Sequence, residues 1–261
     1  NLAQSAYKGV NMPSALEYAN KALELSHENP EAWLIKMKAL GYIGTLGDLN
    51  MLEVVQAGKS AIEFSGSEKE SIELDVYTYQ LDRAKDLLEM ARSCLLDTSD
   101  VRQTYQSFCV INFLTASQNT LNVDSKIVNL YNKVANEAVF LALAVSEDAL
   151  GRYPSLISKL SDCKQLLQKE TDAVRHRFSI YGATLTDSAI EVRNAKEEVF
   201  ENKIKRSRHL AEEHKKKIAE EQAQKNQLYW AEHEEEKSQL ESQKAILLEE
   251  RTPLEIEKNR L

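Results

Sequence analysis

The stretch PSALEYANKALELSHENPEAWLIKMKALGYIG, residues 13–44, decides the fold of this chain. Pro13 lies where the first turn of a helix tolerates a residue that has no N–H group. Asn29 and Pro30 then end a short loop and open a second helix. Because a short loop joins neighbouring helices in an antiparallel way, the sequence predicts a helical hairpin. Its first helix covers residues 14–26, and its second begins at Pro30.

This hairpin resembles the tetratricopeptide repeat. That family carries small residues in the second helix of each repeat, then a KALEL-like end, a turn with proline and an aromatic residue that starts the next repeat. The matching positions are Ala15, Ala22 within KALEL, Asn29-Pro30 and Trp33. The resemblance covers residues 1–64. It implies antiparallel helix pairs that present a surface to other proteins and rarely carry chemistry.

Longer helices are predicted after the hairpins, since no 34-residue period continues beyond Phe64. Apolar residues at helical spacing predict helices over 67–96, 100–121, 124–150 and 155–177. We therefore expect an all-α fold. TPR-like antiparallel hairpins (1–64) would continue into longer packed helices that form a bundle or solenoid (65–182).

The composition changes after Gly182. Residues 191–261 contain 15 Lys and Arg, 17 Asp and Glu, and no glycine. Glu and Lys four residues apart, as at Glu201 and Lys205, stabilise an exposed helix. About 65 uninterrupted helical residues would span roughly 100 Å. The sequence thus predicts that residues 183–261 form a long charged helix or coiled-coil arm.

Four leucines recur every seven residues near the end of the chain, like a leucine zipper: Leu240, Leu247, Leu254 and Leu261. The companion position three residues earlier is basic each time (Lys237, Lys244, Arg251 and Lys258), which disfavours a parallel dimer. A narrow stripe that packs on another helix is the alternative to a zipper. The spacing further upstream favours a loose or antiparallel contact, so a homo-oligomer through this segment stays open.

An aromatic cluster interrupts the charged segment at Leu228, Tyr229 and Trp230. A solvated helix face seldom carries tryptophan, so these residues need something to pack against. They either pack within the molecule or contact a partner protein or a second copy.

The bulk composition excludes several classes of function. A net charge of −8 argues against a nucleic-acid binder, and the longest apolar run, residues 138–145, is too short to span a membrane. Cys94, Cys109 and Cys163 show no CxxC spacing, so neither a zinc site nor a disulfide framework is indicated. We expect a soluble, cytoplasmic protein.

Nothing in the sequence nominates an active site. The run from His209 to His214 reads HLAEEH, but histidines five residues apart do not share a helix face as zinc ligands must. Gly58-Lys59-Ser60 lacks the earlier glycine of a phosphate-binding loop. We expect no catalytic residue, no cofactor and no metal.

The sequence therefore predicts a non-enzymatic scaffold or adaptor that binds proteins through its TPR-like surface and its coiled-coil-like arm. The candidate residues on the hairpins are Tyr18, Trp33, Lys36, Met37, Lys38 and Tyr42, of which Trp33 is the first candidate to belong to the core instead; those on the arm are Leu228, Tyr229 and Trp230. The alternatives are a structural or membrane-associated assembly subunit of a larger complex and a regulatory fragment of an enzyme.

Overall fold

The computed structural model describes residues 2–43, 48–96, 120–178 and 184–258. All regular secondary structure in these ranges is helical, which confirms the predicted all-α class. The helix predicted for residues 100–121 lies outside the described residues up to residue 119. The chain divides into two units, Asn1–Ala211 and Glu212–Leu261. We call them the body and the arm and describe each by itself.

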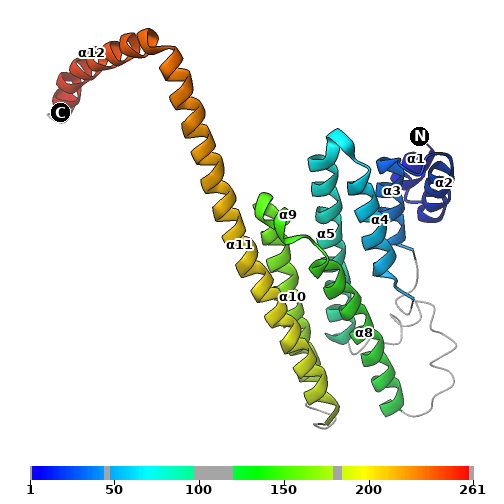
Figure 1. The fold of residues 1–261 in the computed structure, drawn as a ribbon. Helices are drawn as coiled ribbons and strands as arrows, with labels where there is room; N and C mark the ends of the chain where they lie inside the picture. Colours follow the sequence, from blue (N-terminus) through cyan, green and yellow to red (C-terminus); the bar gives the residue numbers. More distant parts are fainter. Residues whose placement is uncertain (1, 44–47, 97–119, 179–183, 259–261) are drawn as a thin grey trace. The chain divides into compact units, whose positions relative to one another are not determined.

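Four short helices open the body: α1 (Leu2–Lys8), α2 (Met12–Leu25), α3 (Pro30–Leu40) and α4 (Met51–Glu63) (Figure 1). The Oδ1 atoms of Asn11 and Asn29 each accept a hydrogen bond from the backbone N–H three residues later, at 3.2 and 3.1 Å. Each asparagine is thus an N-cap, and a proline follows it in the first turn. Each helix packs against the next, and α1 also contacts α3. Residues 14–25 and the segment after Pro30 are helical, close to the predicted bounds.

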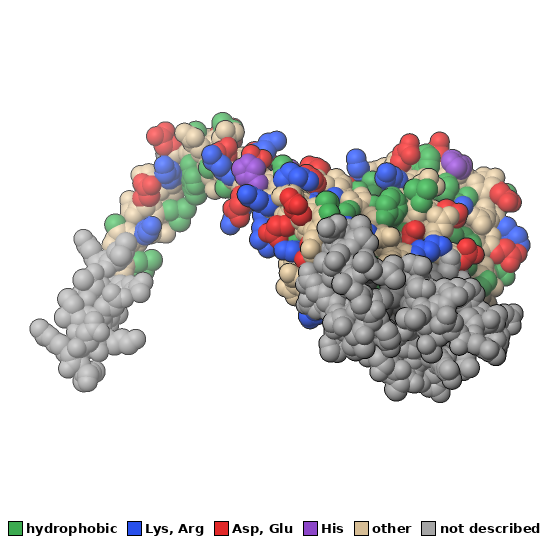
Figure 2. Space-filling view, turned by 90° about the horizontal axis from the view of Figure 1, so that it is seen from below, with side chains coloured by type: hydrophobic (Ala, Val, Ile, Leu, Met, Phe, Trp, Pro, Cys, Tyr) green, Lys and Arg blue, Asp and Glu red, His purple; other side chains and the backbone are tan. Residues whose placement is uncertain are grey.

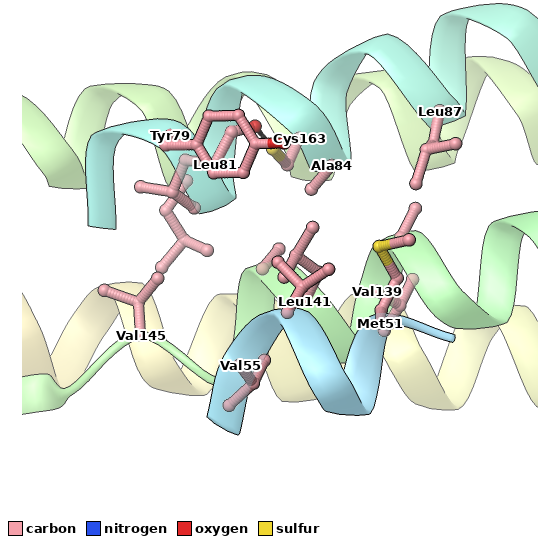
Figure 3. Packing of buried hydrophobic residues seen from close by; sticks show 14 of the residues in the cluster. Met51, Val55, Tyr79, Leu81, Ala84, Leu87, Val139, Leu141, Val145 and Cys163 are labelled. Atoms are coloured by element: carbon pink, nitrogen blue, oxygen red, sulfur yellow. Dashed lines mark hydrogen bonds between the residues drawn. The ribbon is translucent and has the colours of Figure 1, made fainter. Parts of the chain in front are cut away.

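Longer helices complete the body: α5 (Lys69–Leu96) after a short 3₁₀ turn η1 (Gly66–Glu68), then α8 (Thr120–Leu143), α9 (Glu147–Arg152) and α10 (Pro154–Phe178). Helix α5 contacts α4, α8 and α10, so it joins the hairpins to the later helices. Side chains of α4, α5 and α8 point toward one another in the core (Figure 3). One hydrophobic cluster therefore runs across the predicted boundary at residue 64, from Met37 to Ile204.

The single helix predicted for residues 124–150 is wrong. Helix α8 ends at Leu143, and α9 begins at Glu147. Ser146 between them has an extended backbone, and two acidic residues, Glu147 and Asp148, fill the first turn of α9. Ser followed by acidic residues is a helix start, because the carboxylates interact favourably with the free N–H groups. Val145 is buried nonetheless, so the apolar pattern continued through the break and concealed it.

Helix α11 (Thr184–Glu232) contributes its first part to the body. Phe200, Ile204 and Ser207 are buried there at spacings of four and three residues. Lys203 Nζ donates to the carbonyl oxygen of Leu143 at 2.8 Å, and burial lowers the pKa of this lysine. The structure thus divides the chain after Ala211, whereas the sequence placed the start of the arm at residue 183.

The arm comprises the rest of α11 and helix α12 (Glu234–Lys258). The prediction of an uninterrupted helix fails at His233, which belongs to neither helix. Backbone hydrogen bonds still surround it, because its N–H donates to Tyr229 O and its carbonyl accepts from Lys237 N, each at 3.1 Å. The break is therefore a local bend in an otherwise helical segment (Figure 1).

Candidate protein-binding surfaces

Helix α3 carries four of the six candidate residues of the hairpins, Trp33, Lys36, Met37 and Lys38, and it is buried on two sides. Ile35 and Ala39 belong to a small cluster with α1 and α2, whereas Met37 belongs to the large core of the body. Met37 is fully buried, and a Cβ atom on Gly58 of α4 would lie 2.9 Å from its sulfur. Met37 is therefore a core residue, and its assignment to a binding face is wrong. A helix with neighbours on both sides buries more than one stripe.

Trp33 joins α3 to the turn before it and to the end of α4. Its Nε1 donates to the carbonyl oxygen of His27 at 2.7 Å, and the His27 ring meets its edge at 5.2 Å. The His27 ring also contacts Phe64, at 5.6 Å. Lys36 Nζ lies 5.1 Å from the centre of the Trp33 ring, a cation–π contact. Trp33 is half-buried against the core, so Met37, and not Trp33 as expected, is the candidate that belongs fully to the core.

Lys38 and Tyr42 lie close in the chain, and α5 engages both of them. Lys38 Nζ forms an ion pair with Asp75 at 2.7 Å. The Tyr42 ring meets the Tyr79 ring edge-on at 6.2 Å, and the Arg83 guanidinium lies 4.8 Å from its centre. Tyr42 remains 48% exposed. Lys38 and Tyr42 thus lie at the outer edge of a junction between α3 and α5. Because Lys38 is paired with Asp75, the exposed part of Tyr42 is what this junction can offer to a partner protein.

The three residues of α5 at this junction were not identified from the sequence. Tyr79 Oη donates to Lys38 O at 2.8 Å, and Arg83 Nε donates to Gly41 O at 2.7 Å. Tyr79 and Arg83 thus donate to carbonyl groups at the end of α3, where the last carbonyl groups of a helix have no backbone partner. Burial raises the pKa of Tyr79 far above its ordinary value. Asp75, Tyr79 and Arg83 are spaced four apart, so they share a helix face; that spacing was the available signal.

Tyr18 lies on α2, and its contacts differ from those of the candidates on α3. It is half-buried against the small cluster, and Lys21 Nζ lies 5.7 Å from its ring centre. Lys21 also pairs with Glu17 at 2.6 Å. The hairpin candidates thus fall into separate places: Tyr18 on α2, Trp33 with Lys36 on α3, and Lys38 with Tyr42 at its end.

The arm presents the aromatic cluster to solvent. Leu228 is 66% and Tyr229 48% exposed, and Trp230 is half-buried. The Tyr229 ring stacks on His233 at 4.2 Å with an interplanar angle of 15°, and it meets Trp230 edge-on at 5.0 Å. His233 Nδ1 lies 2.9 Å from Tyr229 O. The three rings support one another at the bend, yet Leu228 and much of Tyr229 stay uncovered.

Further large apolar side chains are exposed along the arm: Ile218 (54%), Leu240 (53%), Ile246 (57%) and Leu247 (64%). None of the described side chains from Glu212 to Leu247 is buried. Figure 2 shows such hydrophobic side chains at the surface of the arm among charged ones. Large apolar side chains that are exposed singly are common in folded proteins, whereas adjacent ones mark interaction sites. The cluster of Leu228, Tyr229 and Trp230 therefore makes the arm the stronger candidate surface of the two.

The described residues contain no group of three or more His, Cys, Asp or Glu side chains that could hold a metal ion. Cys163 is buried in the core with its sulfur 3.5 Å from Leu81 O, and burial raises the pKa of its thiol to about 12. Such a thiol is a poor nucleophile, because the thiolate is the reactive form. No helix in the described ranges is both long and apolar enough to cross a membrane.

No family model, curated protein or solved structure matches the chain. The resemblance of residues 1–64 to tetratricopeptide repeats consequently remains a prediction. The contacts and exposure of residues in the body and in the arm are thus the physical basis for assigning a function.

Proposed function

We propose that this protein is a non-enzymatic scaffold for protein–protein interaction. The body supplies a rigid helical platform, and its TPR-like hairpins offer a secondary contact surface around Lys36 and Tyr42. The arm supplies the principal contact surface through the aromatic cluster and the apolar residues that flank it. The partner proteins would bind helix faces rather than enter a pocket.

The observation that supports this proposal most is the exposure of large apolar side chains along a helix with no buried described residue from Glu212 to Leu247. A helix that is polar on all sides is stable in water through its charged pairs and needs no apolar stripe. Exposed Leu228 and Tyr229 therefore cost solubility without stabilising the arm. Binding of a partner protein would explain why these side chains are exposed, since aromatic anchors dominate the binding energy of protein interfaces.

Affinity capture with matched variants tests the proposal. The full chain on a solid support is exposed to a lysate of the source cells, and bound proteins are identified by mass spectrometry. We expect Trp230→Ala to lose partners that bind the arm and Lys36→Glu to lose partners that bind the hairpins. Each loss should be at least about tenfold, the usual effect of removing an interface anchor.

Two control variants belong to this experiment. Gln224→Ala lies on the arm, and Lys59→Glu lies on α4; both positions are exposed. Neither should change the captured set. Capture of the same proteins in the same amounts by Trp230→Ala, Lys36→Glu and the wild type would contradict the assignment of both surfaces.

A further inference from the structure

Positive and negative charges separate along the C-terminal helices. Residues 203–217 contain seven Lys or Arg and two Glu, whereas residues 220–241 contain seven Glu and two Lys. The two kinds of charge are nearly balanced over residues 191–261 as a whole, so the separation does not follow from composition. The aromatic cluster lies in the middle of the acidic part. Negative charge is therefore concentrated around the aromatic cluster.

The carboxylates that follow the cluster form no ion pair within the described part of the chain. Glu232, Glu234 and Glu236 are all exposed, and no described side chain pairs with them. At 1.5 Å of helix per residue they lie within roughly 11 Å of Tyr229 along the helix axis. This distance is close to the Debye length of about 10 Å at 0.1 M salt. A cationic side chain that contacts Tyr229 would therefore also be attracted by these carboxylates.

Two carboxylates share the face of α11 that Leu228 occupies. Glu221 lies seven residues before Leu228, and Glu232 lies four residues after it, so all three are on one side of the helix. Lys225, three residues before Leu228, lies on that side as well, and negative charge remains in excess. A partner that covers Leu228 thus meets an apolar side chain and carboxylates together.

The end of α11 has the wrong charge for a helix that is stabilised by itself. The helix ends at Glu232 and has no basic residue in its last turn. A helix C-terminus carries partial negative charge and is stabilised by nearby cations, so a glutamate there is unfavourable. Glu234 and Glu236, by contrast, suit the first turn of α12. Helix stability therefore explains the glutamates after the bend but not Glu232.

We propose that the aromatic cluster binds a cationic amphipathic helix of another protein. The apolar side chains of that helix would cover the cluster, and its Lys or Arg side chains would lie beside Glu232 and Glu234. Arginine suits such a site best, because its guanidinium stacks on aromatic rings and pairs with carboxylates. Nucleic acids and anionic lipid surfaces are repelled by the same charge. The inference rests on the proposed function, because it names the class of partner that the arm binds.

A second copy of this chain fits the site less well. Its cationic part is residues 203–217, in which Ile204 is buried in the body and Lys203 and Arg206 are paired with it. Between residues 205 and 217 no large apolar side chain is exposed. A second copy would therefore bring positive charge to the aromatic cluster without apolar anchors to cover it.

Binding of designed peptides to the full chain tests the chemistry of the partner. The chain has two tryptophans, so in a Trp33→Phe background the indole fluorescence reports on Trp230 alone. Four helical peptides of equal length are compared. Three share one apolar stripe and carry Arg, Gln or Glu at the other positions, and the fourth carries Arg without the stripe. We expect the Arg peptide with the stripe to bind at least about tenfold more tightly than the others, and to weaken about tenfold between about 50 and about 500 mM salt.

A triple variant tests the carboxylates themselves. Glu232→Gln, Glu234→Gln and Glu236→Gln together should weaken binding of the cationic peptide about tenfold and reduce its dependence on salt. Glutamine forms helices nearly as well as glutamate, so the arm should stay helical. The matched control makes the same change in net charge at three exposed glutamates of the hairpins and should bind like the wild type: Glu24→Gln, Glu28→Gln and Glu63→Gln.

Several results would overturn the proposal. One is the absence of any preference for the Arg peptide over the Gln and Glu peptides, and another is failure of all four peptides to bind. An unchanged affinity in the triple variant would overturn it as well. Dimerisation of the chain that the triple variant abolishes, measured by sedimentation equilibrium, would mean that a second copy occupies the site instead.

The outcomes separate this inference from the proposed function. If affinity capture yields partners that require Trp230, and the triple variant captures them equally well, the inference about charge is refuted and the scaffold proposal stands. If the cationic peptide binds as expected but no protein is captured through the arm, the site has the proposed chemistry and the scaffold role is refuted.

Discussion

Two parts of the same helix, α11, have similar sequences and different environments. Up to Ala211 the helix buries Phe200, Ile204 and Ser207 in the body, although it is rich in Lys and Arg. From Glu212 onward none of its described side chains is buried. The difference shows that the charge content of a helix does not reveal whether the helix packs against the rest of the protein. A helix can pack where a small or apolar residue recurs every three or four positions, as from Phe200 to Ala211.

The charged residues of the packed part are accommodated individually. Arg206 forms a two-atom contact with Glu147, which holds the pKa of that carboxyl below its usual range. Lys164 Nζ contacts Glu201, for which the sequence predicted a pair with Lys205. Lys203 extends its amine to the carbonyl end of α8. Long basic side chains can cover apolar surface while their charged ends remain paired.

The largest effect should distinguish the two parts directly. Phe200 is among the largest fully buried side chains of the body, so Phe200→Ala should lower the free energy of unfolding by about 3–5 kcal/mol. Tyr229→Ala in the arm should change it by less than about 0.5 kcal/mol. Urea denaturation followed by circular dichroism measures both. Equal effects would mean that the arm is packed as tightly as the body.

The second effect concerns the tyrosines at alkaline pH. Burial raises the pKa of Tyr79, so the folded state keeps a proton that the unfolded state loses above about pH 10. The stabilisation is complete below that pH and is lost as pH rises further, by up to about 1.4 kcal/mol per pH unit. Tyr79→Phe should remove this part of the slope. An unchanged slope in Tyr79→Phe would contradict the assignment of this slope to Tyr79.

The third effect should have the opposite sign. Ser207 Oγ is fully buried and has no hydrogen-bond partner among the described residues. Burying an unpaired hydroxyl costs free energy, so Ser207→Ala should stabilise the body by up to about 1 kcal/mol. Gln224→Ala, in the exposed part of the same helix, is the matched control. A loss of stability in Ser207→Ala would mean that the hydroxyl has a partner, for instance a buried water.

The smallest effect belongs to the charged surface of the arm. Lys216 and Glu220 lie 3.9 Å apart, and their side chains are 80% and 61% exposed. An exposed pair of this kind contributes little, so Lys216→Ala should shift the unfolding midpoint within experimental error. Thermal denaturation at low and at high salt checks this. A large, salt-sensitive shift would show that the pair belongs to a stronger network or interface.

Local sequence signals predicted the beginning of the fold well. Pro13 and Asn29-Pro30 mark helix starts because their effect does not depend on distant contacts. Met37 was misassigned because α3 has apolar residues on two sides. The sequence pattern alone does not show that one side packs on α2 and the other on α4 and α5. The division after Ala211 was missed for a related reason. Residues of α8, α9 and α10, distant in sequence, decide that Phe200 and Lys203 are packed.

Of the candidate surfaces, the sequence identified the aromatic cluster of the arm and could not separate the hairpin residues. Lys38 and Tyr42 look like free surface residues in the sequence, yet Asp75, Tyr79 and Arg83 contact them from another helix. Leu228 and Tyr229 were distinguishable because they stand out on a polar helix. Exposure on an isolated helix follows from local composition, whereas burial between helices depends on tertiary contacts.

The central claim is that the exposed apolar residues of the arm form a contact surface, while Phe200, Ile204 and Ser207 of the same helix are already covered in the body. Hydrogen–deuterium exchange of the full chain, alone and with captured partner proteins added, tests it most directly. We expect amides between Ile218 and Leu240 to gain protection when the partners are added, and those between Phe200 and Ser207 to be protected equally in both samples. Unchanged exchange along the arm in the presence of the partners would contradict the claim.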